Sequence, residues 1–480
     1  MKKNDLYDLV HSLTKSEKRH FQLKNRRQGE TVDYFRLFEI LDKIEVFDEK
    51  KLKNVFPEQV NAGQLHVTKN YLREKILESL RQFHSQISRD ALVKDFLKNV
   101  EIFFYKELYT QASDELARAE KLAAEYELHT AQIEVSRWKR RLEQTLHPHR
   151  YDRFAEILEE QRRATDALQN NLEHWQHIVH TSQRFMQYAA VIPKPEGLPS
   201  EPPPAQSLES NILYFNSLYI KNLREGNPEQ AENALQKLLK ILEAQPARVK
   251  EDPGSCLTTV GNLAAFRTFR GEGEAALELL RSSRLFWEKI GIPDRRRPVL
   301  KQLVRLLNIE LEIYRTAENP AQFEDFFRET GEFVKKVAPK IPDDYLLSFH
   351  FQLAWVCFLK RDFDLALDWL SEPLNESRKH AGQPVFRYLL LLNLMVHCEL
   401  RNVFVLRYFV ENARRQFKKS GELAAWEQEL LAFFTKTGQS AEGDWKGLRR
   451  DLQQRLFPET APSLVPEEVL RMLDFRRWLC

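Results

Sequence analysis

The stretch NPEQAENAL, residues 227–235, contains a helix start and one copy of a pattern that recurs along the chain. Asn227 is a capping residue, and Pro228 stands at the first helical position, where its missing N–H costs no hydrogen bond. Ala231 and Leu235 follow four residues apart, which places both on one side of a helix. The stretch therefore predicts an α-helix from residue 228 that buries one apolar stripe.

The apolar pair at positions 231 and 235 recurs at intervals of 40 to 47 residues, apart from one interval of 77. Each pair would open the second helix of a helical hairpin; the pairs are Ala112 with Leu116, Phe154 with Leu158, Ala231 with Leu235, Ala276 with Leu280, Phe323 with Phe327, Ala366 with Leu370, Leu406 with Val410, and Leu448 with Leu452. A hairpin of this length cannot bury its own stripe, so neighbouring hairpins must stack. The recurrence predicts an all-α solenoid of helical hairpins behind an N-terminal helical domain. An irregular helical bundle is the alternative.

The composition agrees with helices that have one wet face. Glycine is scarce, at 15 of 480 residues, while 30% of residues are charged and 42% are hydrophobic. Sheet-rich folds with many tight turns usually need more glycine. The net charge of +3 argues against a protein that binds polyelectrolytes with its whole surface, although residues 1–94 alone carry 19 basic and 14 acidic residues.

Two segments predict the centre of the stack. Residues 349–359 and 388–398 are apolar on nearly all sides and fall on the first helices of consecutive hairpins. A helix that is hydrophobic all round is buried on both faces. The most apolar run, 388–398, has 11 residues and already contains Asn393 and His397, whereas a membrane span needs about 20. We therefore expect no membrane segment.

The chain reads as cytoplasmic. No uninterrupted apolar stretch follows the first five residues, which argues against a secretory signal. The cysteines lie far apart without a CxxC pair, at Cys256, Cys357, Cys398 and Cys480. This spacing is typical of buried or free thiols in a reducing compartment.

Six prolines between residues 192 and 207 predict an extended, solvated linker. An additional helix at 170–190 is expected before it. The expected organisation has five parts: an N-terminal basic helical domain (1–92), a first helical-repeat segment (93–191), the proline-rich linker (192–207), a C-terminal helical-repeat array (208–457) and a C-terminal capping helix (458–480).

Several hairpin starts resemble tetratricopeptide repeats. From Tyr109 through Ala112, Leu116 and Ala119 the order is aromatic, small, large, small, as in the second helix of that repeat. Residues 227–235 and 362–370 resemble the same turn and helix start, and Trp138 lies where the family often has an aromatic residue. The likeness covers about 93–455, with a spacing longer than the usual ~34 residues. It implies a right-handed α–α superhelix. Residues 13–21, LTKSEKRHF, also look like the start of some uncharacterised bacterial helical-repeat proteins, which implies no activity.

No motif for catalysis, cofactor binding or metal binding is found. The chain lacks GxxxxGK[ST], HExxH and GxSxG, and no GxGxxG follows a strand. His174, His177 and His180 are spaced by three, so successive side chains drift about 60° around a helix and converge poorly on one ion. We expect these histidines to form a solvated helix face. The sequence thus predicts a protein that is not an enzyme and needs no cofactor.

The expected function is that of a protein-interaction scaffold or adaptor. Stacked hairpins line their concave face with first helices, which bind extended peptides or partner helices. The solvent-facing candidates on these helices are Lys139, Asn216, Arg224, Arg305, Asn308, Glu312, Arg315 and Tyr388. Basic side chains prevail among them, so we expect a protein or peptide partner with an acidic or C-terminal segment.

A regulator that binds nucleic acid is the alternative. Residues 48–56 and 65–83 could form a helix-turn-helix whose second helix carries Lys69, Arg73, Lys75 and Arg81. The segment joining them is longer than the usual turn, and Glu74 and Glu78 offset the positive charge. A solvated charged face is the commoner explanation of such a pattern.

Overall fold

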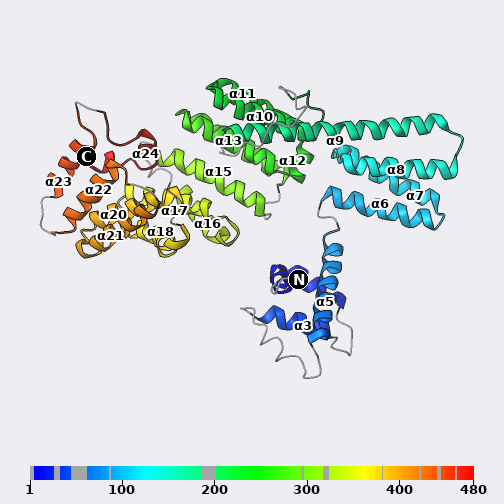
Figure 1. Ribbon diagram of the computed structural model, residues 1–480, viewed down its shortest axis with the longest axis horizontal. Helices are drawn as coiled ribbons and strands as arrows, with labels where there is room; N and C mark the ends of the chain where they lie inside the picture. Colours follow the sequence, from blue (N-terminus) through cyan, green and yellow to red (C-terminus); the bar gives the residue numbers. More distant parts are fainter. Residues whose placement is uncertain are drawn as a thin grey trace. The chain divides into compact units, whose positions relative to one another are not determined.

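The computed structural model describes residues 5–25, 33–44, 62–85, 88–185, 202–292, 297–316, 324–380, 382–420, 423–439, 445–459 and 462–479 (Figure 1). All regular secondary structure in these ranges is helical, so the protein is all-α. The chain forms two compact units. Unit 1 contains Met1–His177 and Lys194–Ser210, and unit 2 contains Ile178–Pro193 and Asn211–Cys480. The division into five parts expected from the sequence stays a prediction.

Four helices at the start of unit 1 share a small core; they are α1 (Asp5–Ser12), α2 (Lys15–Asn25), α3 (Asp33–Lys43) and α5 (Ala62–Phe83). Helix α1 contacts α3, and both α2 and α3 contact α5. Phe21, Phe38 and Leu72 are buried between them. Helix α2 begins with a capping box: the Thr14 N–H donates to Glu17 Oε2 at 2.6 Å, and the Glu17 N–H donates to Thr14 Oγ1 at 3.3 Å.

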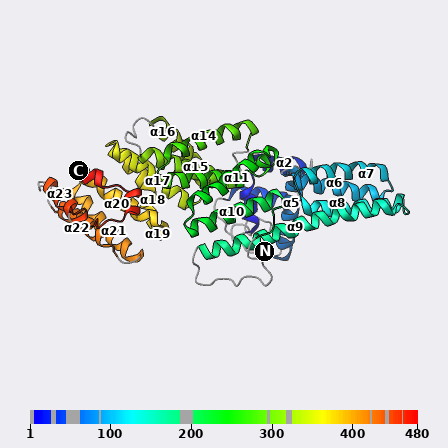
Figure 2. The same cartoon turned by 90° about the horizontal axis from the view of Figure 1, so that it is seen from above.

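The rest of unit 1 is built on four longer helices, α6 (Arg89–Tyr105), α7 (Tyr109–Glu125), α8 (His129–Leu146) and α9 (Tyr151–Phe185). In Figures 1 and 2, α6, α7 and α8 run side by side, and each contacts the other two. Small residues allow this approach, since Ala112, Ala119 and Ala123 of α7 are fully buried. The unit boundary falls inside α9.

Unit 2 consists of helical hairpins and shorter connecting helices. Its helices are α10 (Leu208–Glu225, whose first three residues belong to unit 1), α11 (Pro228–Glu243), α12 (Pro246–Glu251), α13 (Gly254–Phe269), α14 (Gly273–Ile290), α15 (Arg297–Thr316), α16 (Glu324–Val337), η2 (Ala338–Lys340), α17 (Asp343–Leu359), α18 (Phe363–Asn375), α19 (Ser377–His380), α20 (Pro384–Glu399), α21 (Val403–Ser420), α22 (Ala425–Thr437), α23 (Trp445–Leu456), α24 (Glu467–Met472) and α25 (Arg476–Leu479).

Five hairpins of unit 2 contact one another in chain order. We call α13, α15, α17, α20 and α22 the first helices, and α14, α16, α18, α21 and α23 the second helices. Each first helix contacts the next first helix, and each second helix contacts the first helix of its own hairpin. The second helices α14, α16, α18 and α21 also contact the first helix of the following hairpin.

Six hairpin turns in the described residues close with the same hydrogen bond. The N–H after a residue with positive φ donates to the carbonyl five residues back, at 2.8 to 3.0 Å, which is the Schellman cap. The residues with positive φ are Glu107, Glu127, Gly226, Gly271, Arg361 and Arg401. They join α6 to α7, α7 to α8, α10 to α11, α13 to α14, α17 to α18 and α20 to α21. The recurring turn gives these hairpins a common geometry.

The apolar pairs expected to open second helices are buried at five places in both positions, at Ala112 and Leu116, Ala231 and Leu235, Ala276 and Leu280, Ala366 and Leu370, and Leu406 and Val410. Phe323 lies outside the described residues. The pair Phe154 and Leu158 is an exception, because Leu158 is 50% exposed. A separate additional helix at 170–190 is also wrong. Both expectations fail because residues 151–185 form one continuous helix, α9, where two separate helices were expected.

Helices α17 and α20 are buried on nearly all sides, as expected from their composition. Phe349 and Trp355 of α17 and Leu392 of α20 are at most 2% exposed. Three of the four cysteines, Cys256, Cys357 and Cys398, are buried free thiols, and Cys480 lies outside the described residues. None of the described helices combines the length and the apolar character that crossing a membrane requires.

Candidate functional site

The expected partner-binding residues fall on four helices. Lys139 is on α8 in unit 1. The others are in unit 2: Asn216 and Arg224 on α10, Arg305, Asn308, Glu312 and Arg315 on α15, and Tyr388 on α20. Their side chains differ in exposure, since Arg224 is exposed and Arg315 is fully buried, while the other five of unit 2 are half-buried. We therefore consider them in turn.

Arg305 lies across the first helices at the start of the stack. Its Nη2 donates to Asn262 Oδ1 of α13 at 2.8 Å. Gly261 makes room for the guanidinium, because a Cβ at that position would lie 3.1 Å from Arg305 Nη1. Burial raises the pKa of Tyr219 on α10, and the charge of Arg305 opposes this shift. We call Tyr219, Asn262 and Arg305 the Arg305 cluster.

The Arg305 cluster holds an uncompensated positive charge. No carboxylate of the described residues forms an ion pair with Arg305, whose hydrogen-bond partner is a neutral amide. A guanidinium has five N–H donors arranged to bind a carboxylate with two of them. Lys301, one turn earlier on α15, lies over the Tyr345 ring with its Nζ 5.0 Å from the ring centroid. This part of the surface is suited to an acidic group.

Of the neighbouring candidates, Asn308 joins the first helices α15 and α17. Asn308 Nδ2 donates to the Tyr345 carbonyl at 3.3 Å, and the Asn308 carbonyl accepts from Gln352 Nε2 at 3.3 Å. Asn216 donates to the Ile212 carbonyl of its own helix at 2.8 Å. Arg224 is exposed and lies 4.0 Å from Glu225. Within the described part of the chain, no hydrogen bond or ion pair joins Asn216 or Arg224 to Arg305.

Arg315 does not face solvent, and its expected position is wrong. The side chain is 3% exposed and donates through all three of its nitrogens. Nε donates to Gln352 Oε1 at 2.7 Å, Nη1 to the Met472 carbonyl at 3.0 Å, and Nη2 to the Arg471 carbonyl at 3.1 Å. The reason is that the C-terminal segment folds back over the first helices, which places α24 beside the end of α15 (Figure 1). We call residues 463–479 the C-terminal strap.

Tyr388 is half-buried under the same strap. Its ring centroid lies 6.0 Å from that of Phe351 on α17. Burial raises the pKa of Tyr388, and the negative charges of Glu427 and of Glu468 in the strap raise it further. The strap therefore covers Arg315, whereas no hydrogen bond or ion pair within the described residues joins it to Arg305.

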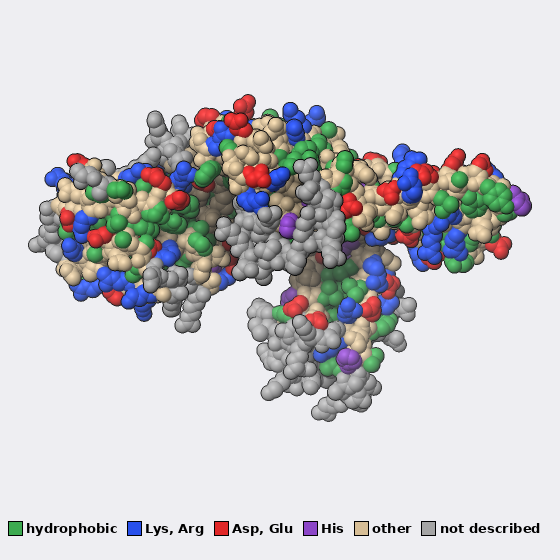
Figure 3. All heavy atoms as spheres, turned by 45° about the horizontal axis from the view of Figure 1, so that its top comes forward, with side chains coloured by type: hydrophobic (Ala, Val, Ile, Leu, Met, Phe, Trp, Pro, Cys, Tyr) green, Lys and Arg blue, Asp and Glu red, His purple; other side chains and the backbone are tan. Residues whose placement is uncertain are grey.

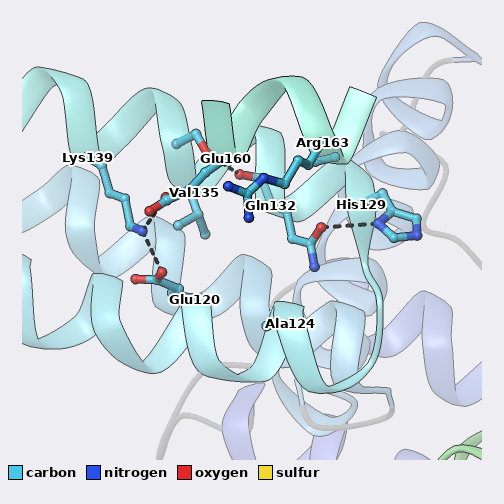
Figure 4. Close-up of a pocket in the computed structure, with 10 residues that line it drawn as sticks. Glu120, Ala124, His129, Gln132, Val135, Lys139, Glu160 and Arg163 are labelled. Carbon is cyan, nitrogen blue, oxygen red and sulfur yellow. Dashed lines mark hydrogen bonds and ion pairs between the residues drawn. The ribbon is translucent and has the colours of Figure 1, made fainter. Parts of the chain in front are cut away.

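Lys139 lies in a pocket of about 360 Å³ formed by α7, α8 and α9 (Figure 4). Its Nζ is 2.5 Å from Glu120 Oε1 of α7 and 2.7 Å from Glu160 Oε2 of α9. The Lys139 side chain is only 10% exposed, so it differs from the expected solvent-facing position. Two carboxylates neutralise this ammonium, and the ion pairs tie α7 and α9 to α8.

Polar residues on one side of α8 line this pocket, and the sequence did not identify them as a group. His129, Gln132, Ser136 and Lys139 follow at spacings of three and four, which places them on one face of the helix. Gln132 bonds His129 Nδ1 at 3.1 Å and donates from Nε2 to the Ala123 carbonyl at 3.0 Å (Figure 4). Helical spacing of polar residues is the signal that could have found the pocket.

His174 and His177 of α9 are buried rather than solvated, so the expectation is wrong for these two histidines, whereas His180 is half-buried. His174 and His177 are 0% and 7% exposed. Burial lowers the pKa of His174, and a hydrogen bond with the Pro203 backbone opposes the shift. Asn170 Nδ2 also donates to the Pro204 carbonyl at 3.1 Å. Residues 203–207 therefore pack on this side of α9.

The same packing shows that the end of the linker, which was expected to be solvated, lies against α9. Residues 192–201 lie outside the described ranges, but the end of the linker is bound to α9. The hydroxyl of Ser207, a residue that is 3% exposed, donates to Asn171 Oδ1 at 2.6 Å.

In the described part of the chain, no group of three or more His, Cys, Asp or Glu side chains is arranged to hold a metal ion.

Four basic side chains of the N-terminal helices form ion pairs with acids. Lys18 bonds Asp42, Arg73 bonds Glu74, and both Lys24 and Lys75 bond Glu78. These two lysines lower the pKa of Glu78 to about 2. The first helix of the expected helix-turn-helix, at 48–56, lies outside the described residues, whereas α5 coincides with the second. On the face drawn in Figure 3, basic and acidic side chains are interspersed rather than segregated.

Fold and surface together define a class, an all-α protein whose helical hairpins contact one another in chain order. The chain matches no protein-family model, no curated protein and no solved structure. The tetratricopeptide resemblance therefore rests on the residues alone.

Proposed function

We propose that this protein is a non-enzymatic scaffold or adaptor that binds a peptide or partner protein on the first-helix face of unit 2. In this proposal the hairpins form a tetratricopeptide-like, right-handed superhelix, and the first helices line its concave side. The ordered contacts from α13 to α22 and the recurring Schellman turn support the repeat arrangement. The three buried free thiols support a cytoplasmic location.

The observation that carries the proposal is the Arg305 cluster. A half-buried guanidinium with a neutral hydrogen-bond partner retains its charge in an environment that weakens screening by water. An acidic segment or a C-terminal carboxylate of the partner would neutralise it. Asn216, Arg224, Asn308 and Glu312 remain proposed members of this surface. Arg315, Lys139 and Tyr388 contribute through packing and ion pairs within the chain.

The test is capture of partners by the tagged, full-length protein in its native cell. Arg305→Glu would repel an acidic segment, so we expect at least ten-fold less of the principal co-purifying protein. The matched control is Arg328→Glu on α16, because Arg328 is exposed and pairs only with exposed Asp325 in the described residues. We expect both variants to melt within about 2 °C of the wild type. Equal capture by the two variants would contradict the proposed surface.

A role in nucleic-acid binding has less support. The ion pairs of Lys18, Lys24, Arg73 and Lys75 with carboxylates reduce the charge available to phosphates. The proposed function therefore places partner binding on unit 2.

A further inference from the structure

The C-terminal strap contacts four of the five first helices, α13, α15, α20 and α22. Midway along the strap, Arg471 lies over the Phe269 ring at the end of α13, with a distance of 4.7 Å. Its last residues reach α20, α22 and the second helix α23, where Trp478 Nε1 donates to Glu399 Oε1 of α20 at 2.6 Å. The apolar side chains that it buries are Val465, Val469, Leu470, Leu473, Phe475, Trp478 and Leu479. The strap thus covers part of the face on which stacked hairpins bind peptides.

Recognition by α15 is directed at the main chain of the strap. Arg315 donates to the carbonyls of Arg471 and Met472. These are backbone acceptors, which every peptide possesses. The third donor of Arg315 is bonded to Gln352 of α17, which fixes the guanidinium in place. The Arg315 contact therefore positions an extended or short helical segment without reading its side chains.

Recognition by α22, α23 and the end of α20 is directed at two aromatic side chains. Phe475 is fully buried and stacks on Trp426 of α22, with ring centroids 6.0 Å apart. Trp478 packs against Phe433 and Phe434 of α22, each with centroids 5.7 Å away. The guanidinium of Arg449 on α23 covers the Trp478 ring at 4.8 Å. Two aromatic anchors three residues apart are thus buried among aromatic side chains beside a charged group, as in an interaction hot spot.

The strap has little structure of its own. Its helices α24 and α25 contain six and four residues. Helices this short are unstable in water without packing, so the first helices impose the conformation of the strap. These properties are those of a peptide ligand that folds on its receptor.

We propose that α15, α22, α23 and the end of α20 form a peptide-binding surface for segments with a Phe-x-x-Trp arrangement, and that the C-terminal strap is its intramolecular occupant. A partner segment of the same chemistry binds when the strap leaves. This inference deepens the proposed function and rests on it for the claim that the first-helix face binds partners. It adds the ligand chemistry and the competition with the chain's own terminus.

The experiment measures binding of a fluorescein-labelled peptide of residues 462–479 to the full-length protein by fluorescence anisotropy. In the variant Phe475→Ala, Trp478→Ala the resident strap loses both anchors and competes less well. We expect this variant to bind the peptide at least ten-fold more tightly than the wild type. A peptide in which Phe475 and Trp478 are replaced by alanine should bind at least ten-fold more weakly than the native peptide.

The matched control is the variant Phe404→Ala, Tyr408→Ala, which removes two aromatic side chains of α21 that are 93% and 63% exposed. It should bind the peptide as the wild type does. Equal affinity of all three proteins, or equal binding of the native and alanine peptides, would overturn the proposal. Arg305→Glu should leave peptide binding unchanged. Failure of the peptide-binding test can therefore be distinguished from failure of the partner-capture test.

Wild-type protein provides a second measurement in case the anchor variant does not fold. Excess unlabelled peptide should compete with closure of the strap and accelerate hydrogen exchange of amides 465–479 at least three-fold. Amides of α17 should not change. Unchanged exchange in the strap would mean that it is a permanent part of the core, and the inference would be wrong.

Discussion

At the scale of single residues, the hairpin turns depend on positions that amino-acid type alone does not reveal. Two of the six Schellman turns use glycine, at Gly226 and Gly271, whereas the others place glutamate or arginine at φ between 49° and 64°. A side chain in this conformation costs about 1 kcal/mol or more relative to glycine. The packing of the hairpins therefore stabilises turns that the sequence did not mark as breaks.

Gly331 has no turn to form; it permits close packing of two second helices. It lies within α16, and a Cβ there would be 2.9 Å from Cζ2 of the buried Trp369 on α18. We expect overpacking in Gly331→Ala to lower the free energy of unfolding by about 1–3 kcal/mol. The higher helix propensity of alanine should offset up to about 1 kcal/mol of this loss. Urea unfolding followed by tryptophan fluorescence measures the change.

Gly382→Ala is the control for this substitution, because no atom lies within 4 Å of a Cβ at that position. It should change the unfolding free energy by less than about 0.5 kcal/mol. If Gly331→Ala were as stable as the control, Trp369 would be able to move away from the added Cβ without a loss of stability.

At the scale of elements, α15 connects the C-terminal strap to the hairpins through one buried cation. Arg315→Met removes the donors for Gln352 and for two strap carbonyls, leaving buried acceptors without partners. A lost hydrogen bond of this kind costs about 1–3 kcal/mol. We expect the variant to lose about 3 kcal/mol of stability, with faster hydrogen exchange in the strap.

Arg328→Met tests whether loss of any arginine has this effect. Arg328 is on α16, its side chain is 64% exposed, and its ion pair with Asp325 is on the surface. Such pairs contribute little, so the change should stay below about 1 kcal/mol. Equal losses in the two variants would remove the special role of Arg315.

The elements themselves were largely predictable. The start of α11 at Pro228 and the buried pairs of the second helices follow from local spacing. Helix α9 was not predicted as one element, because nothing in its polar sequence distinguishes a continuous helix from two. The helical pattern of α8 also contained the Lys139 pocket, but only the ion pairs with Glu120 and Glu160 reveal that the lysine is covered.

At the scale of the molecule, the hairpins of unit 2 should respond to damage as a repeat array does. Each hairpin contacts its neighbours, so a local defect spreads to them first. Leu370→Ala opens a cavity at a fully buried position of α18 and should cost about 2–5 kcal/mol. We expect the largest loss of hydrogen-exchange protection in α17, α18 and α20, and a much smaller loss in α11.

Leu365→Ala changes a leucine of the same helix that is 41% exposed. It should leave the exchange pattern nearly unchanged. If Leu370→Ala instead lowered protection equally in α11 and α18, the hairpins would behave as one cooperative bundle and the repeat architecture would be in doubt.

The sequence by itself determined the helical class, the hairpin spacing and the all-round burial of α17 and α20, because hydrophobic periodicity and capping act between residues a few positions apart. Tertiary structure alone decided which polar side chains are covered. Arg315 is buried by carbonyls 156 and 157 residues away, and Asn170 of α9 is bonded to a carbonyl 34 residues away. Burial of a helix face depends on whichever distant segment packs on it, and periodicity within one helix carries no information about that segment.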